Sequence, residues 1–367
     1  MQIIRHTKCR RILLISAFCA VLFGWTAVAC GQQREWQPQR TWVFAVGILE
    51  WQDAETFPSF PKANRRDAQL VNFFRGEGVP SNQLVYLQDA QATTRRVRER
   101  FAQMLSQTRE GDFLFVYFTG HGYKSDDERT TFFATYDAGE NANGWSTRSI
   151  VSDINWRFHG SRVLLTADCC FSGELTRDTR RLEPRFSYAA LTSAASNQTS
   201  TENWTFTEML LAGLRGRPYA DIDRNGAVTL GELAENEKRD MAFAEDQQAA
   251  FAANGLSDDT VIANAPPPSN ASIGRRVVVR SEGDWYKARV IDARGNRLRV
   301  HYFGYEDADD EWVLPRQIRG NGNSGASRTP EWQRSERQFG RVDGWIRNGP
   351  DQSSTSTRTG WLTTPLN

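Results

Sequence analysis

Two short motifs contain the side chains best suited to covalent catalysis. One holds His121 between two glycines, and the other holds Cys169 and Cys170 directly after Asp168. A cysteine attacks as a thiolate, so a catalytic cysteine needs a base or an imidazolium nearby. The two motifs therefore indicate nucleophilic catalysis by a cysteine and a histidine, provided that the fold brings together residues that are 49 positions apart.

The apolar pattern around these motifs predicts the elements that position them. Three continuous apolar runs, the first from Trp42 to Ile48, are typical of strands that are buried on both faces. The expected strands are residues 42–48, 84–87, 113–118, 162–167 and 186–193, and the expected helices are residues 61–76, 93–108 and 207–214. This alternation predicts an α/β fold with a mostly parallel sheet. Both motifs follow buried strands, where open parallel sheets place their ligand crevice.

Several motifs together make the chain resemble the caspase/metacaspase superfamily, specifically its bacterial caspase-like members. Residues 117–122, Tyr-Phe-Thr-Gly-His-Gly, are similar to the His-Gly motif that follows a strand in this family. Residues 168–173, Asp-Cys-Cys-Phe-Ser-Gly, are similar to the metacaspase motif D-x-C-x-S-G, and residues 64–68 to its N-x-x-D-A helix. In caspases the His also precedes the Cys by about 50 residues. The resemblance covers about residues 41–216 and implies a caspase-like sheet sandwiched by helices, which we expect to form one domain over residues 41–263.

The resemblance also implies roles for the residues in both motifs. It makes Cys170 the nucleophile and His121 the general base and acid of a cysteine endopeptidase that needs no cofactor for catalysis. The backbone N–H groups of Gly122 and Cys170 are then the expected oxyanion donors. We expect Cys169 to fill the core beneath the turn. The family often has His after the nucleophile, whereas this chain has Phe171.

Substrate preference is also inferred from the resemblance. Asp168 and Asp67 align with the two acids that line the metacaspase S1 pocket, which predicts a peptide or protein substrate cleaved after Arg or Lys. A merely solvated Asp67 is the alternative. A different class of function also stays open, namely an exported binding or scaffold protein whose caspase-like domain is inactive.

Residues 221–232 match the spacing of an EF-hand calcium loop. The expected oxygen ligands of a Ca²⁺ ion are Asp221, Asp223, Asn225, the Ala227 carbonyl, Thr229 and a bidentate Glu232. We expect a structural role for the ion rather than a trigger. The alternative is a glycine turn followed by an acidic helix cap.

A second domain is expected after the Pro-rich linker of residues 264–272. Short β runs over residues 273–319 predict a small barrel, and they resemble the SH3-like, Tudor-like group. In that group aromatic cages bind methylated Lys or Arg through cation–π attraction. The cage-like positions here are Trp285, Tyr302, Tyr305 and Trp312. Alternatively these aromatics form the core and rim of the barrel, and its ligand, a peptide or a surface group, is not identified.

The two ends of the chain predict export and a tail. Residues 1–29 have the basic start, the apolar run and the small-residue end of a signal peptide, and we expect a linker over residues 30–40. Cys30 fits a lipidation site, which would attach a periplasmic protein to a membrane. Plain secretion and an uncleaved anchor are the alternatives. Residues 320–367 are rich in Gly, Ser and Thr and are expected to be disordered.

Composition excludes several classes of protein. The chain has 45 basic and 44 acidic residues, which argues against a nucleic-acid partner. Five cysteines in 367 residues are too few for a disulfide-dense scaffold, and without a CxxC or a Cys/His cluster a structural zinc site is not expected.

Overall fold

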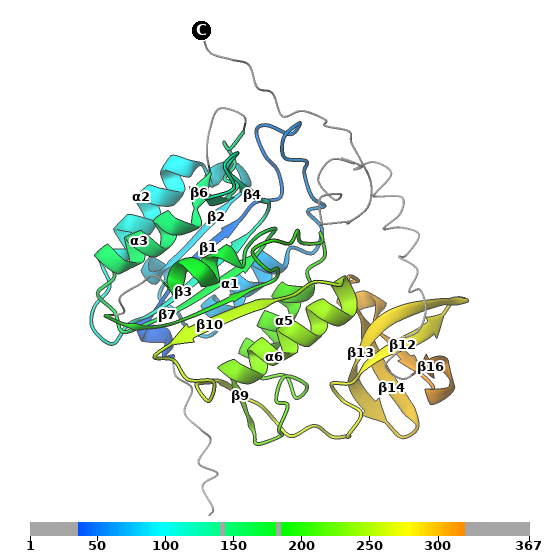
Figure 1. The fold of residues 1–367 in the computed structure, drawn as a ribbon. Helices are drawn as coiled ribbons and strands as arrows, with labels where there is room; N and C mark the ends of the chain where they lie inside the picture. Colours follow the sequence, from blue (N-terminus) through cyan, green and yellow to red (C-terminus); the bar gives the residue numbers. More distant parts are fainter. Residues whose placement is uncertain (1–35, 140–143, 181–184, 320–367) are drawn as a thin grey trace, which may run out of the picture. The chain divides into compact units, whose positions relative to one another are not determined.

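The computed structural model describes residues 36–139, 144–180 and 185–319 (Figure 1). The expected signal peptide, Cys30 and the tail from residue 320 lie outside these residues, so export, lipidation and disorder stay predictions. Within the described ranges, no helix is both long and apolar enough to span a bilayer.

A six-stranded sheet forms the centre of the α/β part, in the order β10-β8-β7-β3-β1-β2. Its strands are β1 (Thr41–Gly47), β2 (Leu84–Gln88), β3 (Phe113–Thr119), β7 (Arg162–Asp168), β8 (Ser187–Thr192) and β10 (Ala250–Asn254). All neighbours are parallel except β10, which pairs antiparallel with β8. The predicted mostly parallel sheet is therefore confirmed, whereas the antiparallel edge strand was not predicted.

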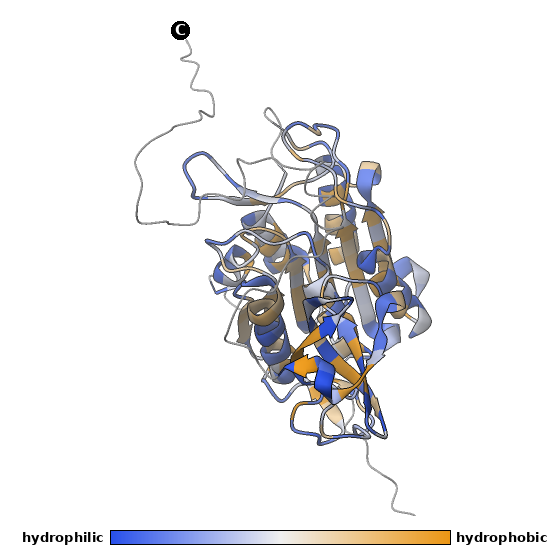
Figure 2. Ribbon diagram, turned by 90° about the vertical axis from the view of Figure 1, so that its right-hand side faces the viewer, coloured by the Kyte–Doolittle hydropathy of each residue, from blue (hydrophilic) through white to orange (hydrophobic). Residues whose placement is uncertain are grey.

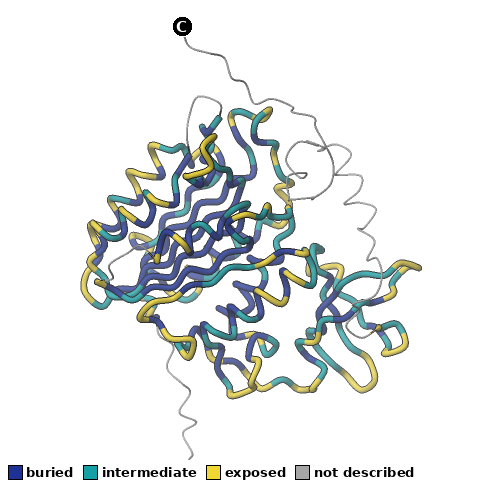
Figure 3. Tube along the Cα trace, in the orientation of Figure 1, coloured by how far each residue is buried: buried dark blue, intermediate teal, exposed yellow. Residues whose placement is uncertain are grey.

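Helices cover both faces of this sheet, as predicted. Alternate strand residues face opposite layers, so that Val116 and Phe118 join one apolar cluster while Phe115 and Tyr117 join the other. One layer contains α2 (Thr94–Leu105), α3 (Thr147–Arg157) and α4 (Glu174–Thr179), and the other contains α1 (Arg66–Gly76), α5 (Thr205–Leu214) and α6 (Leu230–Asp240). The strands between the layers are apolar (Figure 2) and buried along most of their length (Figure 3).

The helix α1 is shorter than the sequence predicted. It begins at Arg66, whereas the apolar pattern predicted a start at residue 61. Asn64 has a φ of 51°, in the left-handed region, which a right-handed helix cannot include. Residues 48–65 therefore form a loop between β1 and α1. By contrast, α2 lies within the predicted range and buries the expected Val97, Phe101, Met104 and Leu105.

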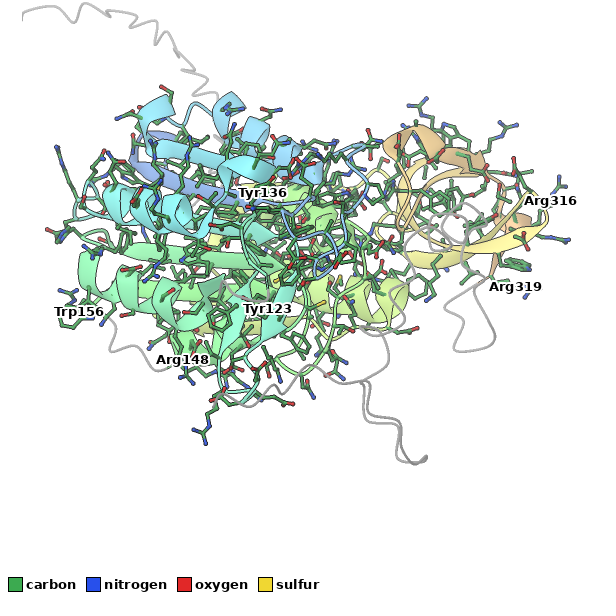
Figure 4. The ribbon with its side chains drawn as sticks, turned by 90° about the horizontal axis from the view of Figure 1, so that it is seen from above. Tyr123, Tyr136, Arg148, Trp156, Arg316 and Arg319 are labelled. Atoms are coloured by element: carbon green, nitrogen blue, oxygen red, sulfur yellow. The ribbon has the colours of Figure 1, made fainter. Side chains whose placement is uncertain are left out.

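Smaller elements complete the α/β part. They are the antiparallel strands β4 (Gly122–Lys124), β5 (Thr131–Phe133) and β6 (Trp145–Ser146), the pair β9 (Ala227–Thr229) and β11 (Val261–Asn264), and the short helices η1 (Pro38–Arg40), η2 (Ser81–Gln83), η3 (Asp89–Gln91) and η4 (Met241–Glu245). Because β4 starts at Gly122, the small sheet β4-β5-β6 begins directly beside His121. Trp156, near the end of α3, is 76% exposed and points away from the sheet (Figure 4).

Residues 276–319 form a five-stranded antiparallel sheet in the order β15-β14-β13-β12-β16. Its strands are β12 (Arg276–Ser281), β13 (Asp284–Arg294), β14 (Arg297–Tyr302), β15 (Glu311–Val313) and β16 (Ile318–Arg319), and the short helices η5 (Asp307–Asp309) and η6 (Pro315–Gln317) flank β15. Its own apolar cluster includes Val277, Val290 and Val300. The predicted strands are confirmed, whereas closure into a Tudor-like barrel stays a prediction.

Candidate active site

Cys170 lies in a turn at the carboxyl end of β7. The strand ends at Asp168, Cys169 is 2% exposed in the apolar core, and Cys170 is partly exposed. The next residue, Phe171, has a φ of 56°, an uncommon conformation for a bulky side chain. The turn thus separates the two thiols by environment: Cys169 packs, as predicted, and Cys170 is the more accessible. Both are free thiols.

His121 lies in the corresponding turn after β3. Its Nε2 is 2.8 Å from the carbonyl oxygen of Pro58. A carbonyl can only accept a hydrogen bond, so Nε2 carries the proton, and Nδ1 is the basic nitrogen of the neutral ring. The rings of Trp51 and Phe60 lie 4.5 and 4.4 Å from the imidazole centroid. Burial lowers the pKa of His121 to about 4, although the bond to Pro58 raises it, so the ring is neutral at pH 7.

The parallel register brings the two turns together. Thr119 at the end of β3 is opposite Asp168 at the end of β7, so His121 and Cys170 each follow their strand by two residues. Gly122 packs directly on the second turn, and a Cβ at residue 122 would stand only 2.0 Å from the carbonyl oxygen of Cys170. The same Cβ would be 3.2 Å from Sγ of Cys169. A glycine is therefore required beside His121 for the contact to form.

Backbone N–H groups surround the Cys170 thiol. The N–H of Ser200, in the loop after β8, donates to Sγ at a distance of 3.1 Å. Burial raises the pKa of the Cys170 thiol, whereas the N–H groups of Ser200, Cys170 and Gly122 lower it. The net direction is upward, so the resting thiol is protonated at neutral pH and needs a base to become a thiolate. These N–H groups also provide partners for negative charge at this point.

Asp168, the last residue of β7, is almost fully buried. Its Oδ2 accepts a hydrogen bond of 2.7 Å from the hydroxyl of Thr207 on α5. Burial raises the pKa of Asp168 to about 6, against hydrogen bonds from Thr207 and Ser193 that lower it. Its recognition of a basic substrate side chain stays a prediction.

Asp67 is completely buried, and both of its carboxylate oxygens are already bound. Nη2 of Arg65 donates to Oδ2 at 2.7 Å, and the hydroxyl of Tyr86 donates to the same oxygen at 2.7 Å. Oδ1 accepts from the N–H of Ala68 at 2.9 Å and from Nε of Arg65 at 3.1 Å. The predicted solvated alternative is therefore wrong. A substrate role for Asp67 stays a prediction, and it requires Arg65 to move, because no carboxylate oxygen is free in this conformation.

Two contributors to the site were not predicted. Pro58 orients His121 and Ser200 donates to Cys170, in both cases through the backbone. A backbone group has no residue-specific signal in the sequence, so only the folded loops reveal these roles. The only sequence feature that could have indicated a role for this loop was its group of aromatic residues, which includes Trp51, Phe57 and Phe60.

A polar groove elsewhere on the α/β part contains neither motif. Its volume is about 650 Å³, and its lining includes Glu110, His159, Ser161 and Ser187. These residues lie at or near the amino ends of β3, β7 and β8. The groove and the two motifs are thus at opposite ends of the strands, and the groove gives His121 and Cys170 no substrate pocket.

The predicted calcium loop brings its three acidic residues together. One oxygen from each of Asp221, Asp223 and Glu232 lies within 4.8 Å of the others. The predicted alternative is also present, because Thr229 caps α6 in a capping box with Glu232. Oε1 of Glu232 accepts from the N–H of Ile222 at 2.7 Å. The donor set fits a hard oxygen-seeking cation such as Ca²⁺, which would compete with these hydrogen bonds.

The four predicted cage aromatics do not form one cage. Tyr302 and Tyr305 contact each other and Tyr286, with ring centroids 5.7–5.9 Å apart. Trp285 instead stacks with Arg319, whose guanidinium is 3.7 Å from the ring centroid, and Trp312 lies under Arg294. Arg319 is labelled in Figure 4. The single cage is therefore wrong, and the core-and-rim alternative fits better, because Tyr302 belongs to the buried cluster of this sheet.

Comparison with known proteins gave fold-level neighbours alone. No family model and no curated protein matches the chain. A protein of Geobacter sulfurreducens, GSU0716, is 14% identical over 62% of this chain and 98% of its own, with a TM-score of 0.45. The Drosophila initiator caspase Dronc is 9% identical over 71% of this chain and 94% of its own, with a TM-score of 0.39. Both scores are low, so the proposal below rests on the geometry of the site.

Proposed function

We propose that this protein is a cysteine endopeptidase in which Cys170 is the nucleophile and His121 transfers protons. The observation that carries the proposal is the packing of Gly122 on the Cys170 peptide, which joins the histidine turn to the cysteine turn. The thiol is partly exposed, and the imidazole of His121, the residue before Gly122, is neutral with Nδ1 as its basic nitrogen. A neutral imidazole can serve as the general base for a protonated thiol, and the proposal requires its Nδ1 to come within hydrogen-bond reach of Sγ in the substrate complex.

The first half of the reaction forms a thioester. Nδ1 of His121 takes the proton of the Cys170 thiol, and the thiolate attacks the substrate carbonyl carbon. The resulting oxyanion is stabilised by the N–H groups of Gly122 and Cys170. His121 then gives its proton to the leaving amine as the C–N bond breaks, so the neutral imidazole is regenerated beside an acyl-enzyme.

The second half of the reaction is hydrolysis. His121 removes a proton from a water molecule, which attacks the thioester carbonyl and releases the carboxylic acid product. The proton returns to the sulfur of Cys170, which restores the thiol. The hydrogen bond from Nε2 to Pro58 holds the ring in one tautomer throughout, so Nδ1 serves both steps.

The proposal is tested with matched variants of the adjacent cysteines. Cys170→Ala removes the nucleophile and is expected to abolish peptide cleavage without changing the fold. Cys169→Ala is the control: it is expected to keep most of the activity and to lower the free energy of unfolding by about 1 kcal/mol, because Cys169 is buried. Cleavage by Cys170→Ala at the wild-type rate would contradict the proposal. Absence of cleavage in the wild type on a broad peptide library would favour the inactive scaffold.

We further propose cleavage after Arg or Lys, based on the carboxyl group of Asp168 close to Cys170 in the chain. Asp168 is the last residue of β7 and precedes Cys170 by two residues. Asp168→Asn is therefore expected to lower kcat/KM for substrates with P1 Arg more than for matched substrates with P1 Gln. Equal losses for both substrates would argue against recognition of a basic P1 side chain.

We also propose that Ca²⁺ binds the loop of residues 221–232 and stiffens it. The support is the convergence of Asp221, Asp223 and Glu232. The carbonyl of Ala227 and the side chains of Asn225 and Thr229 would complete the oxygen ligands. Removal of the ion is expected to lower thermal stability and to leave the chemistry at Cys170 unchanged.

A further inference from the structure

The loop between β1 and α1 supplies most of the surroundings of His121. Pro58 accepts the Nε2 hydrogen bond, and the rings of Trp51, Phe57 and Phe60 pack around the imidazole. The same packing removes water from the ring and lowers its pKa. A shift of this loop would therefore change the tautomer and the basicity of His121 together.

Arg65, the last residue of this loop, binds the residue that directly precedes the loop. Its Nη2 donates to the carbonyl oxygen of Gly47, the last residue of β1, at 2.8 Å. The same nitrogen donates to Asp67 at the start of α1. One guanidinium thus connects the strand before the loop with the helix after it, and the Arg65 side chain is only 9% exposed.

Asp89, directly after β2, supplies the second connection. Nη1 of Arg65 donates to Oδ2 of Asp89 at 2.6 Å, and the N–H of Leu49, in the loop, donates to Oδ1 at 2.9 Å. Asp89 has a φ of 47°, in the left-handed region that non-glycine residues rarely adopt. Strained residues of this kind persist where the surrounding contacts hold them in place, and they occur often near functional sites.

We propose that Arg65 is a positioning residue that closes the loop of residues 48–64 and thereby holds the Pro58 carbonyl on Nε2 of His121. The planar guanidinium reaches Gly47, Asp67 and Asp89 at once, which a lysine ammonium cannot do with the same geometry. The inference rests on the proposed function, because it assigns a purpose to the orientation of the catalytic base. It adds a specific cause for the tautomer and for the low pKa of that base.

The test uses Arg65→Lys in the full chain, with two readouts. Nitrogen NMR of the histidine rings, assigned by comparison with His121→Gln, reports the tautomer and the pKa of His121 without any need for activity. Arg65→Lys is expected to mix the two tautomers and to raise the pKa of His121 by about one unit toward its ordinary value. It is also expected to lower kcat by about tenfold with little change in KM, because the base is misplaced rather than the substrate.

Arg40→Ala is the matched control. Arg40 also pairs with a buried aspartate, Asp112, at 3.1 Å, but at the opposite end of β1. This variant is expected to leave the tautomer and the pKa of His121 unchanged. If Arg65→Lys does not fold, Asp89→Asn takes its place, because the amide oxygen can still accept from Leu49 while the charge that holds Arg65 is lost.

The outcomes separate this inference from the proposed function. A folded Arg65→Lys protein with the wild-type tautomer and pKa of His121 would overturn the positioning role, whatever the activity. Changed NMR signals of His121 in Arg65→Lys, together with a wild-type protein that cleaves no peptide, would support the positioning role and contradict the endopeptidase. Equal changes in Arg65→Lys and Arg40→Ala would show a general loss of stability and would also overturn the inference.

Discussion

Gly122 lies so close to Cys170 that the carbonyl oxygen of Cys170 occupies the space of a Cβ at residue 122. This contact joins two turns that follow neighbouring parallel strands. Because Gly122 makes this contact, the adjacent His121 lies one residue from the turn that contains Cys170. The site therefore depends on a small residue as much as on its two reactive side chains.

Gly122→Ala is expected to damage the site more than the fold. The added methyl group would stand 2.0 Å from the Cys170 carbonyl oxygen, so one of the turns must move. We expect kcat/KM to fall by about 100-fold, because displacements of about 1 Å have effects of this size. Peptide hydrolysis and thermal unfolding measure both effects. Gly76→Ala is the control, since nothing lies within 4 Å of a Cβ there, and wild-type activity in Gly122→Ala would refute the role of the contact.

The activity is expected to fall at low pH as His121 becomes protonated. Burial lowers the pKa of His121 to about 4, so its basic form is present above that pH and is lost below it. The profile of kcat/KM against pH, measured in Asp168→Asn so that no carboxyl group titrates near pH 6 at this position, should therefore have an acidic limb near pH 4. A limb near the ordinary histidine pKa of 6.5 would show that the ring is not buried in the working enzyme.

Asp168→Asn is expected to change how the free energy of unfolding depends on pH. Burial raises the pKa of Asp168 from its ordinary value of 3.8 to about 6. Between these two pH values the folded chain keeps a proton on Asp168 that the unfolded chain has released. This group favours folding at low pH, and its contribution is lost as the pH rises through about 6. The Asn variant lacks this loss, and urea denaturation across about pH 4 to 7 measures the difference. Identical pH dependence in both proteins would contradict the buried carboxyl group.

Calcium is expected to raise the melting temperature through the loop of residues 221–232. Binding to the folded state alone stabilises it by mass action, so the melting temperature should rise with the Ca²⁺ concentration. Asp221→Asn and Glu232→Gln should remove the rise, because each takes away a charged ligand. Asp127→Asn, a change in an exposed acidic turn, serves as the control. An equal rise in all of these variants would point to a different site, and no rise in the wild type would exclude calcium binding at the loop.

The sequence by itself predicted the central strands, the buried face of one helix and the kind of chemistry to propose. Continuous apolar runs identified β1, β3 and β7 because strands buried on both faces need apolar side chains throughout. The periodicity of α2 identified its buried face because one stripe of a helix meets the core. The types of His121 and Cys170 indicated nucleophilic catalysis. All of these signals are carried by a residue and its near neighbours.

Only the tertiary structure decided what surrounds those residues. The carbonyl of Pro58 and the N–H of Ser200 are backbone groups, which nearly all residues share. Which of these groups meets a side chain therefore depends on how the loops fold. The charge of Asp67 is bound by Arg65, which no spacing rule indicated. Likewise, Trp285 and Trp312 pack against arginines rather than joining the tyrosines. Local patterns specify strands and helices, whereas strand order and loop closure decide which groups meet.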